Sequence, residues 1–168
     1  MLAPIRLTGV AGLRCGARWL GAGAVVAALS ACTVGAPDSV GLRDGQLAPC
    51  PPSPNCVSSL ARDEEHAVDA FFLSSKAADA PWPALRAAVE LLPRTVVVEA
   101  RDDYLRAEST SALFRFVDDL ELHWTGGGVV QVRSAARVGH SDLGVNRKRV
   151  EQLRGFLVER GLITAPAM

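Results

Sequence analysis

The spacing of hydrophobic residues predicts two helices, one on each side of a group of strands. The first follows the proline-containing segment 79–83 and ends at Pro93, because proline is accepted in the first turn of a helix but not in its interior. The last begins near Asn146, a favoured N-cap residue, and closes at Gly161. Each has hydrophobic residues at the spacing of one helix face, which are Leu85, Ala88, Val89 and Leu92 in the first and Val150, Leu153, Phe156 and Leu157 in the second.

Four segments between these helices have the pattern of strands. The segment 95–100 is rich in β-branched residues, and the segments 104–109, 120–124 and 130–138 alternate hydrophobic with polar positions. A run of three glycines joins the last two segments, which we therefore predict to form a hairpin. If the hydrophobic faces of that hairpin are kept together, Glu121 lies opposite Arg133.

Together these elements predict an α+β domain in which two helices pack on one face of a four-stranded antiparallel sheet. The other face of the sheet is polar, and it is either solvated or functional. Its predicted members are Glu99, Arg106, Glu121, His123, Gln131, Arg133 and Arg137.

The N-terminal region has the pattern of a bacterial lipoprotein signal peptide. Arginines precede an apolar run at 19–29, and Leu29-Ser30-Ala31-Cys32 matches a lipobox. The run is shorter than the roughly 20 apolar residues that a spanning helix needs. We predict cleavage after Ala31 and lipidation of Cys32, which would hold the protein on a membrane of the cell envelope, facing the periplasm. Thr33 favours the outer membrane, by resemblance to Gram-negative sorting rules. An uncleaved anchor or a misassigned start is the alternative.

Cleavage defines the predicted organisation of the chain and changes its charge. We expect a signal peptide at 1–31, the lipidated cysteine and a flexible tether at 32–48, a single α+β domain at 49–162 and a tail at 163–168. The precursor has 18 basic and 18 acidic residues, and the signal peptide removes three arginines, which leaves a net charge of −3. A nucleic-acid-binding domain would carry a strongly basic face, so no nucleic-acid partner is expected.

Two cysteines remain in the predicted domain, Cys50 and Cys56. Prolines between them make a compact turn plausible, and the oxidising periplasm permits a disulfide. A metal site is the alternative, but it would need two further ligands, and the sequence has no second cysteine pair and no closely spaced histidine pair. We therefore predict a disulfide, no metal and no cofactor.

Charged and polar residues gather where the last strand leads into the last helix. Free N–H groups at a helix start and arginine side chains suit a small anion. Basic residues there oppose the helix dipole at a cost of roughly 0.3–1 kcal/mol each, a local misfit that is typical of functional sites. The candidate ligand-binding residues are Asp118, Asp119, Arg133, Arg137, Ser141, Asp142, Asn146 and Arg147. The alternative, which we favour, is that the aspartates pair with the arginines and fix this corner of the fold.

The run His140-Ser141-Asp142 contains the residue types of a catalytic triad. Adjacent residues cannot align as nucleophile, base and orienting group, so we assign no catalytic residue here.

Two long segments, 47–59 and 132–151, resemble a known family, and 104–107 and 116–119 also fit it. Together they look like the bacterial family of domains of unknown function numbered 1499, over residues 47–157. The resemblance implies a single envelope or membrane-attached domain, and it implies no established activity. The family pattern usually has tyrosine at the position of His140, so an acid–base role for this histidine does not follow from the resemblance.

These observations predict a non-catalytic, lipid-anchored envelope domain that binds a partner or a small anionic ligand. The alternative is an envelope hydrolase or transferase that uses Asp118, Asp119 or Asp142 with arginine stabilisation. An enzyme would show a concave pocket that holds a carboxylate with a raised pKa beside the arginines. A third class, an assembly factor recognised by proteins, would show an exposed apolar patch.

Overall fold

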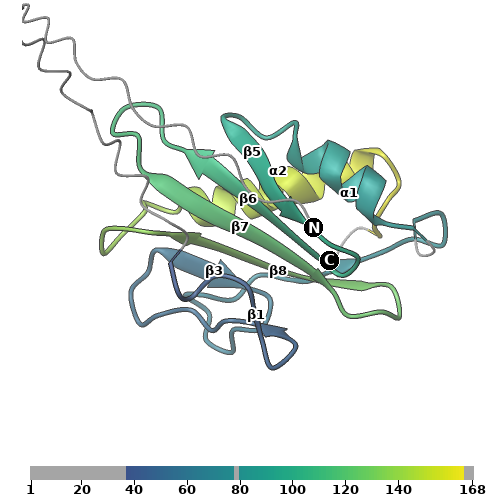
Figure 1. The fold of residues 1–168 in the computed structure, drawn as a ribbon, viewed down its shortest axis with the longest axis horizontal. Helices are drawn as coiled ribbons and strands as arrows, with labels where there is room; N and C mark the ends of the chain where they lie inside the picture. The colour runs from purple at the N-terminus through teal and green to yellow at the C-terminus, as the bar shows by residue number, and fades with distance from the viewer. Residues whose placement is uncertain (1–36, 78–79, 165–168) are drawn as a thin grey trace, which may run out of the picture. The chain divides into compact units, whose positions relative to one another are not determined.

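One antiparallel sheet forms the centre of the computed structural model, which describes residues 37–77 and 80–164 (Figure 1). The strands lie in the order β3-β8-β7-β6-β5, and β4 pairs with β8 as well. Their bounds are β3 (Cys56–Ser58), β4 (Phe71–Phe72), β5 (Thr95–Ala100), β6 (Tyr104–Thr110), β7 (Val117–Trp124) and β8 (Val129–Ala136). The signal peptide, Cys32 and residues 165–168 lie outside the described residues.

The sheet has six strands rather than the four predicted from the sequence. The four predicted strands are present as β5 to β8, and β3 and β4 extend the sheet beyond β8. Each added strand has only two or three residues, which is too short for an alternating pattern to stand out. The α+β class is confirmed, and the number of strands is corrected.

Two helices, α1 (Trp82–Val89) and α2 (Val145–Glu159), supply the other half of the core. The predicted hydrophobic residues of both helices pack with the strand residues that share one face of the sheet. The strand residues at the centre of this core are Leu105, Ala107, Leu120, Leu122, Val130 and Val132. Leu162 and Ile163 also belong to the core, so the domain includes the first residue of the predicted tail.

The start of α2 differs from the prediction. Its N-cap is Gly144, in the left-handed conformation with φ of 77°, and Asn146 lies inside the helix and is fully buried. Asp142 provides the polar contacts at the helix start, because its carboxylate accepts from the backbone N–H groups of Gly144 (2.9 Å) and Asn146 (2.7 Å). The anion at this helix terminus is therefore a side chain of the protein itself.

A hairpin of β1 (Leu42–Arg43) and β2 (Gln46–Leu47) lies on the polar side of the sheet. The N–H of Gly41 donates to Glu121 in β7, and β2 contacts β7 and β8. Leu47 and the following residue are buried. Part of the predicted tether at 32–48 is thus packed against the domain, which begins before Pro49.

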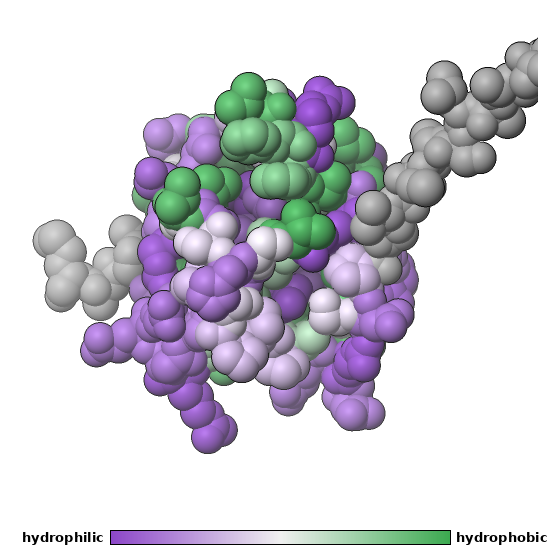
Figure 2. Space-filling view, turned by 90° about the vertical axis from the view of Figure 1, so that its left-hand side faces the viewer, coloured by the Kyte–Doolittle hydropathy of each residue, from purple (hydrophilic) through white to green (hydrophobic). Residues whose placement is uncertain are grey.

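Hydrophobic residues remain exposed at one end of the sheet. Figure 2 looks at the end that lies on the left in Figure 1, and hydrophobic residues gather in the upper part of that view. We call this region the apolar end, and its exposed members in the β6–β7 loop, the β8–α2 loop and the first residue of α2 are Leu113, Phe114, Phe116, Val138, Leu143 and Val145. Within the part of the chain that the structure describes, no helix has the length and hydrophobicity needed to cross a membrane.

Candidate functional site

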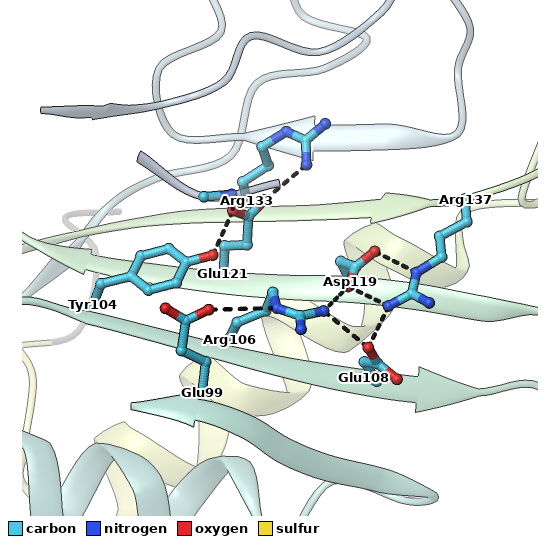
Figure 3. Close-up of polar contacts among 9 residues, drawn as sticks. Glu99, Tyr104, Arg106, Glu108, Asp119, Glu121, Arg133 and Arg137 are labelled. Carbon is cyan, nitrogen blue, oxygen red and sulfur yellow. Dashed lines mark hydrogen bonds and ion pairs between the residues drawn. The ribbon is translucent and has the colours of Figure 1, made fainter. Parts of the chain in front are cut away.

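An ion-pair network covers the polar face of the sheet (Figure 3). Asp119 in β7 is its centre, because its two oxygens accept from Arg137 Nε (2.7 Å), Arg137 Nη2 (2.8 Å) and Arg106 Nη1 (2.9 Å). Glu108 in β6 accepts from the same two arginines. Because alternate residues of a strand share a face, Arg106 and Glu108 of β6 lie beside Asp119 of β7, and Arg137, the residue after β8, joins them.

A second part of the network is built on Glu121, which is completely buried. Its Oε2 accepts from Arg133 Nη1 at 2.8 Å, and its Oε1 accepts from the Tyr104 hydroxyl and from Gly41 N–H, each also at 2.8 Å. Arg133 is only 2% exposed. The predicted register of the hairpin is confirmed, since Glu121 is the cross-strand partner of Arg133.

The network also shifts the protonation equilibria of its members. The hydrogen bond to Asp119 raises the pKa of Arg137 above its ordinary value, and the bond to Glu108 adds to this against the effect of burial. Burial raises the pKa of Tyr104, and the nearby Glu121 carboxylate raises it further. Arg137 therefore stays charged, and Tyr104 stays a hydrogen-bond donor, throughout the physiological pH range.

A pocket of about 450 Å³ opens beside this network. Its lining includes Asp119, Arg133 and Arg137 of the network together with Ser39 and Asn55. The Nε of Arg133 is buried and has no hydrogen-bond partner among the described residues. Buried polar atoms are nearly always paired. Three buried side-chain atoms of the described residues lack a partner, namely Arg133 Nε, His123 Nδ1 and Trp124 Nε1, and of these only Arg133 Nε belongs to a side chain that lines this pocket.

The Cys50–Cys56 disulfide borders the same pocket. The structure contains this bond, with the two Cα atoms 5.6 Å apart, and it closes the loop that carries Asn55. Oxidation of these cysteines in the cell stays a prediction. Among residues 37–77 and 80–164, no group of three or more His, Cys, Asp or Glu side chains is arranged to hold a metal ion.

A separate polar cluster lies on the helix side of the sheet. Asp118 pairs with Arg149 Nη2 at 2.7 Å. Asn146 Oδ1 accepts from Ser134 Oγ (2.6 Å) and Arg149 Nη1 (2.5 Å), and Asn146 Nδ2 donates to the carbonyl of Asn55 (3.2 Å). Burial raises the pKa of Asp118, and the opposing charge of Arg149 offsets this only in part. The cluster joins α2 to β8 and to the residue before β3.

The structure thus divides the predicted ligand-binding residues into several places. Asp119, Arg133 and Arg137 lie together on the polar face, whereas Asp118 and Asn146 lie on the helix side. Each of the remaining three residues makes contacts of its own outside these two groups. Asp142 caps α2, Ser141 Oγ accepts from Leu143 N–H at 3.3 Å, and Arg147 donates to the carbonyls of Ala67 (2.6 Å) and Glu65 (2.8 Å).

Sequence reasoning omitted several residues from the candidate site. Tyr104, Glu108 and Arg149 did not appear in it, although the first two occupy outward positions of a predicted strand. Arg149 follows Asn146 by three residues on a helix, and that spacing could have linked the two. The favoured alternative, in which aspartates pair with arginines, describes Asp118 and Asp119, whereas Asp142 binds backbone N–H groups instead.

His66 holds a neighbouring loop and gives a testable pH dependence. Burial disfavours its charge, but hydrogen bonds to Asp63 (2.6 Å) and to the Ser53 carbonyl (3.2 Å) outweigh burial and raise the pKa of His66 above 6.5. Because the folded-state pKa is higher, the imidazolium stabilises the fold below the unfolded pKa, and this contribution is lost as pH rises through the folded pKa.

We therefore expect His66→Asn to lower the free energy of unfolding more at about pH 5.5 than at about pH 8.5. Urea unfolding of both proteins at the two pH values measures this difference. Asp63→Asn is the matched variant, and it should also weaken the pH dependence because it removes the charged partner. A cost of His66→Asn that is equal at both pH values would contradict the assignment.

Comparison with known proteins assigns the chain to a family. The family model described as "Protein of unknown function (DUF1499)" matches residues 46–157, which is more than half of the chain and nearly the range expected from the resemblance. No curated protein matches the sequence. The matched range includes the disulfide, the ion-pair network and most of α2. The protein therefore belongs to the DUF1499 family.

Proposed function

We propose that this protein is a non-catalytic, lipid-anchored domain of the bacterial cell envelope that binds a small anion in the pocket beside Arg133. Cys32 carries the lipid, and the domain faces the periplasm, with the outer membrane favoured. The proposal of an anionic ligand rests on the buried Nε of Arg133, which lacks an acceptor among the described residues.

The chemistry of Arg133 suits a carboxylate or a phosphate group. Its Nη1 donates to Glu121, whereas its Nε has no acceptor among the described residues, and the side chain lines the pocket. A guanidinium presents its donors as a planar fork that matches such anions. The pocket volume of about 450 Å³ lies in the range of roughly 300–1,000 Å³ that is usual for small-molecule sites.

The arrangement of carboxylates supports a binding function over the hydrolase or transferase alternative. A general base needs a carboxylate oxygen within reach of the substrate proton. Asp119 lines the pocket, but both of its oxygens accept N–H groups from arginines. Burial raises the pKa of Asp118, but this residue does not line the pocket and lies on the other side of the sheet.

Anchoring by Cys32 is supported by the lipobox pattern and by the place where the described domain begins. Several acyl chains on one cysteine suffice for stable attachment, since two buried chains already do. Only four residues lie between Cys32 and Pro37, which lines the pocket. The anchor and the pocket are therefore close together along the chain.

Unfolding experiments test the anion site. In the wild type, inorganic phosphate or acetate should raise the unfolding midpoint above that in chloride at equal ionic strength, because a ligand that binds only the folded state stabilises it. Ser39→Phe should abolish the effect by filling the pocket without touching an ion pair, whereas Ser75→Phe, at an exposed site outside the pocket, should preserve it. A wild type that responds equally to all three salts contradicts the proposal.

A further inference from the structure

We infer that the apolar end of the domain rests in the lipid interface of the same membrane that holds Cys32, with the β6–β7 loop inserted among the lipid headgroups. The inference rests on the lipid anchor proposed above. It goes further by giving the domain one orientation on the membrane.

The β6–β7 loop exposes three large hydrophobic side chains to solvent. Leu113, Phe114 and Phe116 are 79%, 68% and 50% exposed, and the two phenylalanine rings stack with their centroids 5.5 Å apart. Ser111 closes the loop, because its N–H donates to the Phe116 carbonyl (2.8 Å) and its hydroxyl accepts from Phe116 N–H (2.9 Å). A contiguous exposed patch of this kind marks an interaction surface.

The β8–α2 loop adds to the same surface. Arg137 N–H donates to the carbonyl of Val117 at 3.1 Å, so the chain leaves β8 beside the first residue of β7. Val138 and Leu143 then follow as exposed residues of that loop. Figure 2 shows hydrophobic residues gathered over this end of the domain, with hydrophilic residues around them.

The chain enters the domain at this same end. Pro37 lines the pocket together with Arg137, Val138 and Gly139. Four residues separate it from Cys32, and five extended chain steps span at most about 18 Å. A lipid on Cys32 therefore keeps Pro37, which lines one pocket with Val138 of the apolar end, within that distance of the membrane, and the chain length thus favours the lipid surface as the occupant.

The charges around the apolar end suit an anionic membrane. Arg115 is exposed at the tip of the β6–β7 loop, and Arg94 and Lys148 are exposed near Val145, with which they line one shallow pocket. Basic side chains beside inserted aromatic and aliphatic ones are attracted to anionic lipid headgroups. The acidic residues in these parts of the chain are Asp38 and Asp44, which are exposed near the start of the domain, and Asp142, which is partly exposed in the β8–α2 loop.

Fluorescence quenching by lipid tests the orientation. The mature lipoprotein, produced from the full chain, is reconstituted in vesicles of phosphatidylethanolamine and phosphatidylglycerol that contain a nitroxide-labelled lipid. A fluorophore is attached to Ala112→Cys at the β6–β7 loop or to Thr125→Cys at the opposite end of the sheet. We expect several-fold stronger quenching at position 112. Phe114→Ser should reduce this quenching, and Phe72→Ser, at another exposed phenylalanine near the opposite end, should not.

The mass of the same protein separates the two proposals. An acylated Cys32 with equal quenching at both positions overturns the membrane orientation and leaves the anchor in place. An unmodified Cys32 overturns both the lipid anchor and the membrane orientation, because the length of the chain then no longer limits the distance between the domain and the membrane. Weak quenching by the labelled lipid at position 112, together with self-quenching between the labels of different molecules, identifies a second copy as the occupant and also overturns the inference.

Discussion

Arg133→Ala should lower the free energy of unfolding by about 3–5 kcal/mol, because removal of one member of a buried ion pair leaves the other charge without a partner. Glu121 is completely buried, and its Oε2 accepts from Arg133 Nη1 at 2.8 Å. After the substitution the carboxylate keeps only the Tyr104 hydroxyl and one backbone N–H. Urea unfolding of the two proteins measures the difference.

The pair of Arg101 and Glu99 is the matched control for this prediction. Their side chains are 52% and 40% exposed, so Arg101→Ala should cost less than about 1 kcal/mol. The double variant Arg133→Met with Glu121→Gln should recover much of the stability lost in Arg133→Ala, since no buried charge remains. A cost of Arg133→Ala as small as that of Arg101→Ala would mean that the pair is solvated in solution.

A structural role for Arg133 does not compete with the proposed anion site. Nη1 stabilises the fold through Glu121, and Nε is the donor without an acceptor among the described residues. The two roles use different atoms of one guanidinium. For this reason the binding test changes Ser39, which lines the pocket and takes no part in the network.

Strand periodicity explains how much of the polar face could be predicted. A period of two put Glu121 and Arg133 on one face and opposite each other, and the structure has that register. The same rule separates neighbours in the sequence, so Asp118 and Asp119 point to opposite sides of β7. The predicted strand began at Leu120, whereas β7 begins at Val117, so the rule was not applied to the two aspartates and they were grouped in one site.

The remaining differences come from signals that are short or that tertiary contacts override. Asp44-Gly45 is a strong hairpin signal, with both residues at positive φ, yet its strands have only two residues each and were read as tether. Strands β3 and β4 depend on pairing with β8, which is distant in sequence. Asn146 has the preference of an N-cap residue, but its side chain bonds to Ser134, Arg149 and Asn55 instead.

Asn146→Ala should therefore destabilise the fold by at least about 2 kcal/mol, because buried groups left without partners cost about 1–3 kcal/mol each. The side-chain amide of Asn146 bonds to Ser134 Oγ, to Arg149 Nη1 and to the carbonyl of Asn55. These partners come from β8, from α2 and from the residue before β3, so one side chain holds three parts of the fold together. Loss of its oxygen also removes one of the acceptors that orient Arg149 toward Asp118.

Urea unfolding measures this effect, with Gln152→Ala on an exposed position of the same helix as the control. Ser134→Ala should cost less than Asn146→Ala, and the double variant should cost less than the sum, because the two residues share a hydrogen bond. Additive costs would mean that the amide and the hydroxyl are not coupled. A cost of Asn146→Ala no greater than that of Gln152→Ala would mean that α2 is held to the sheet by its hydrophobic face alone.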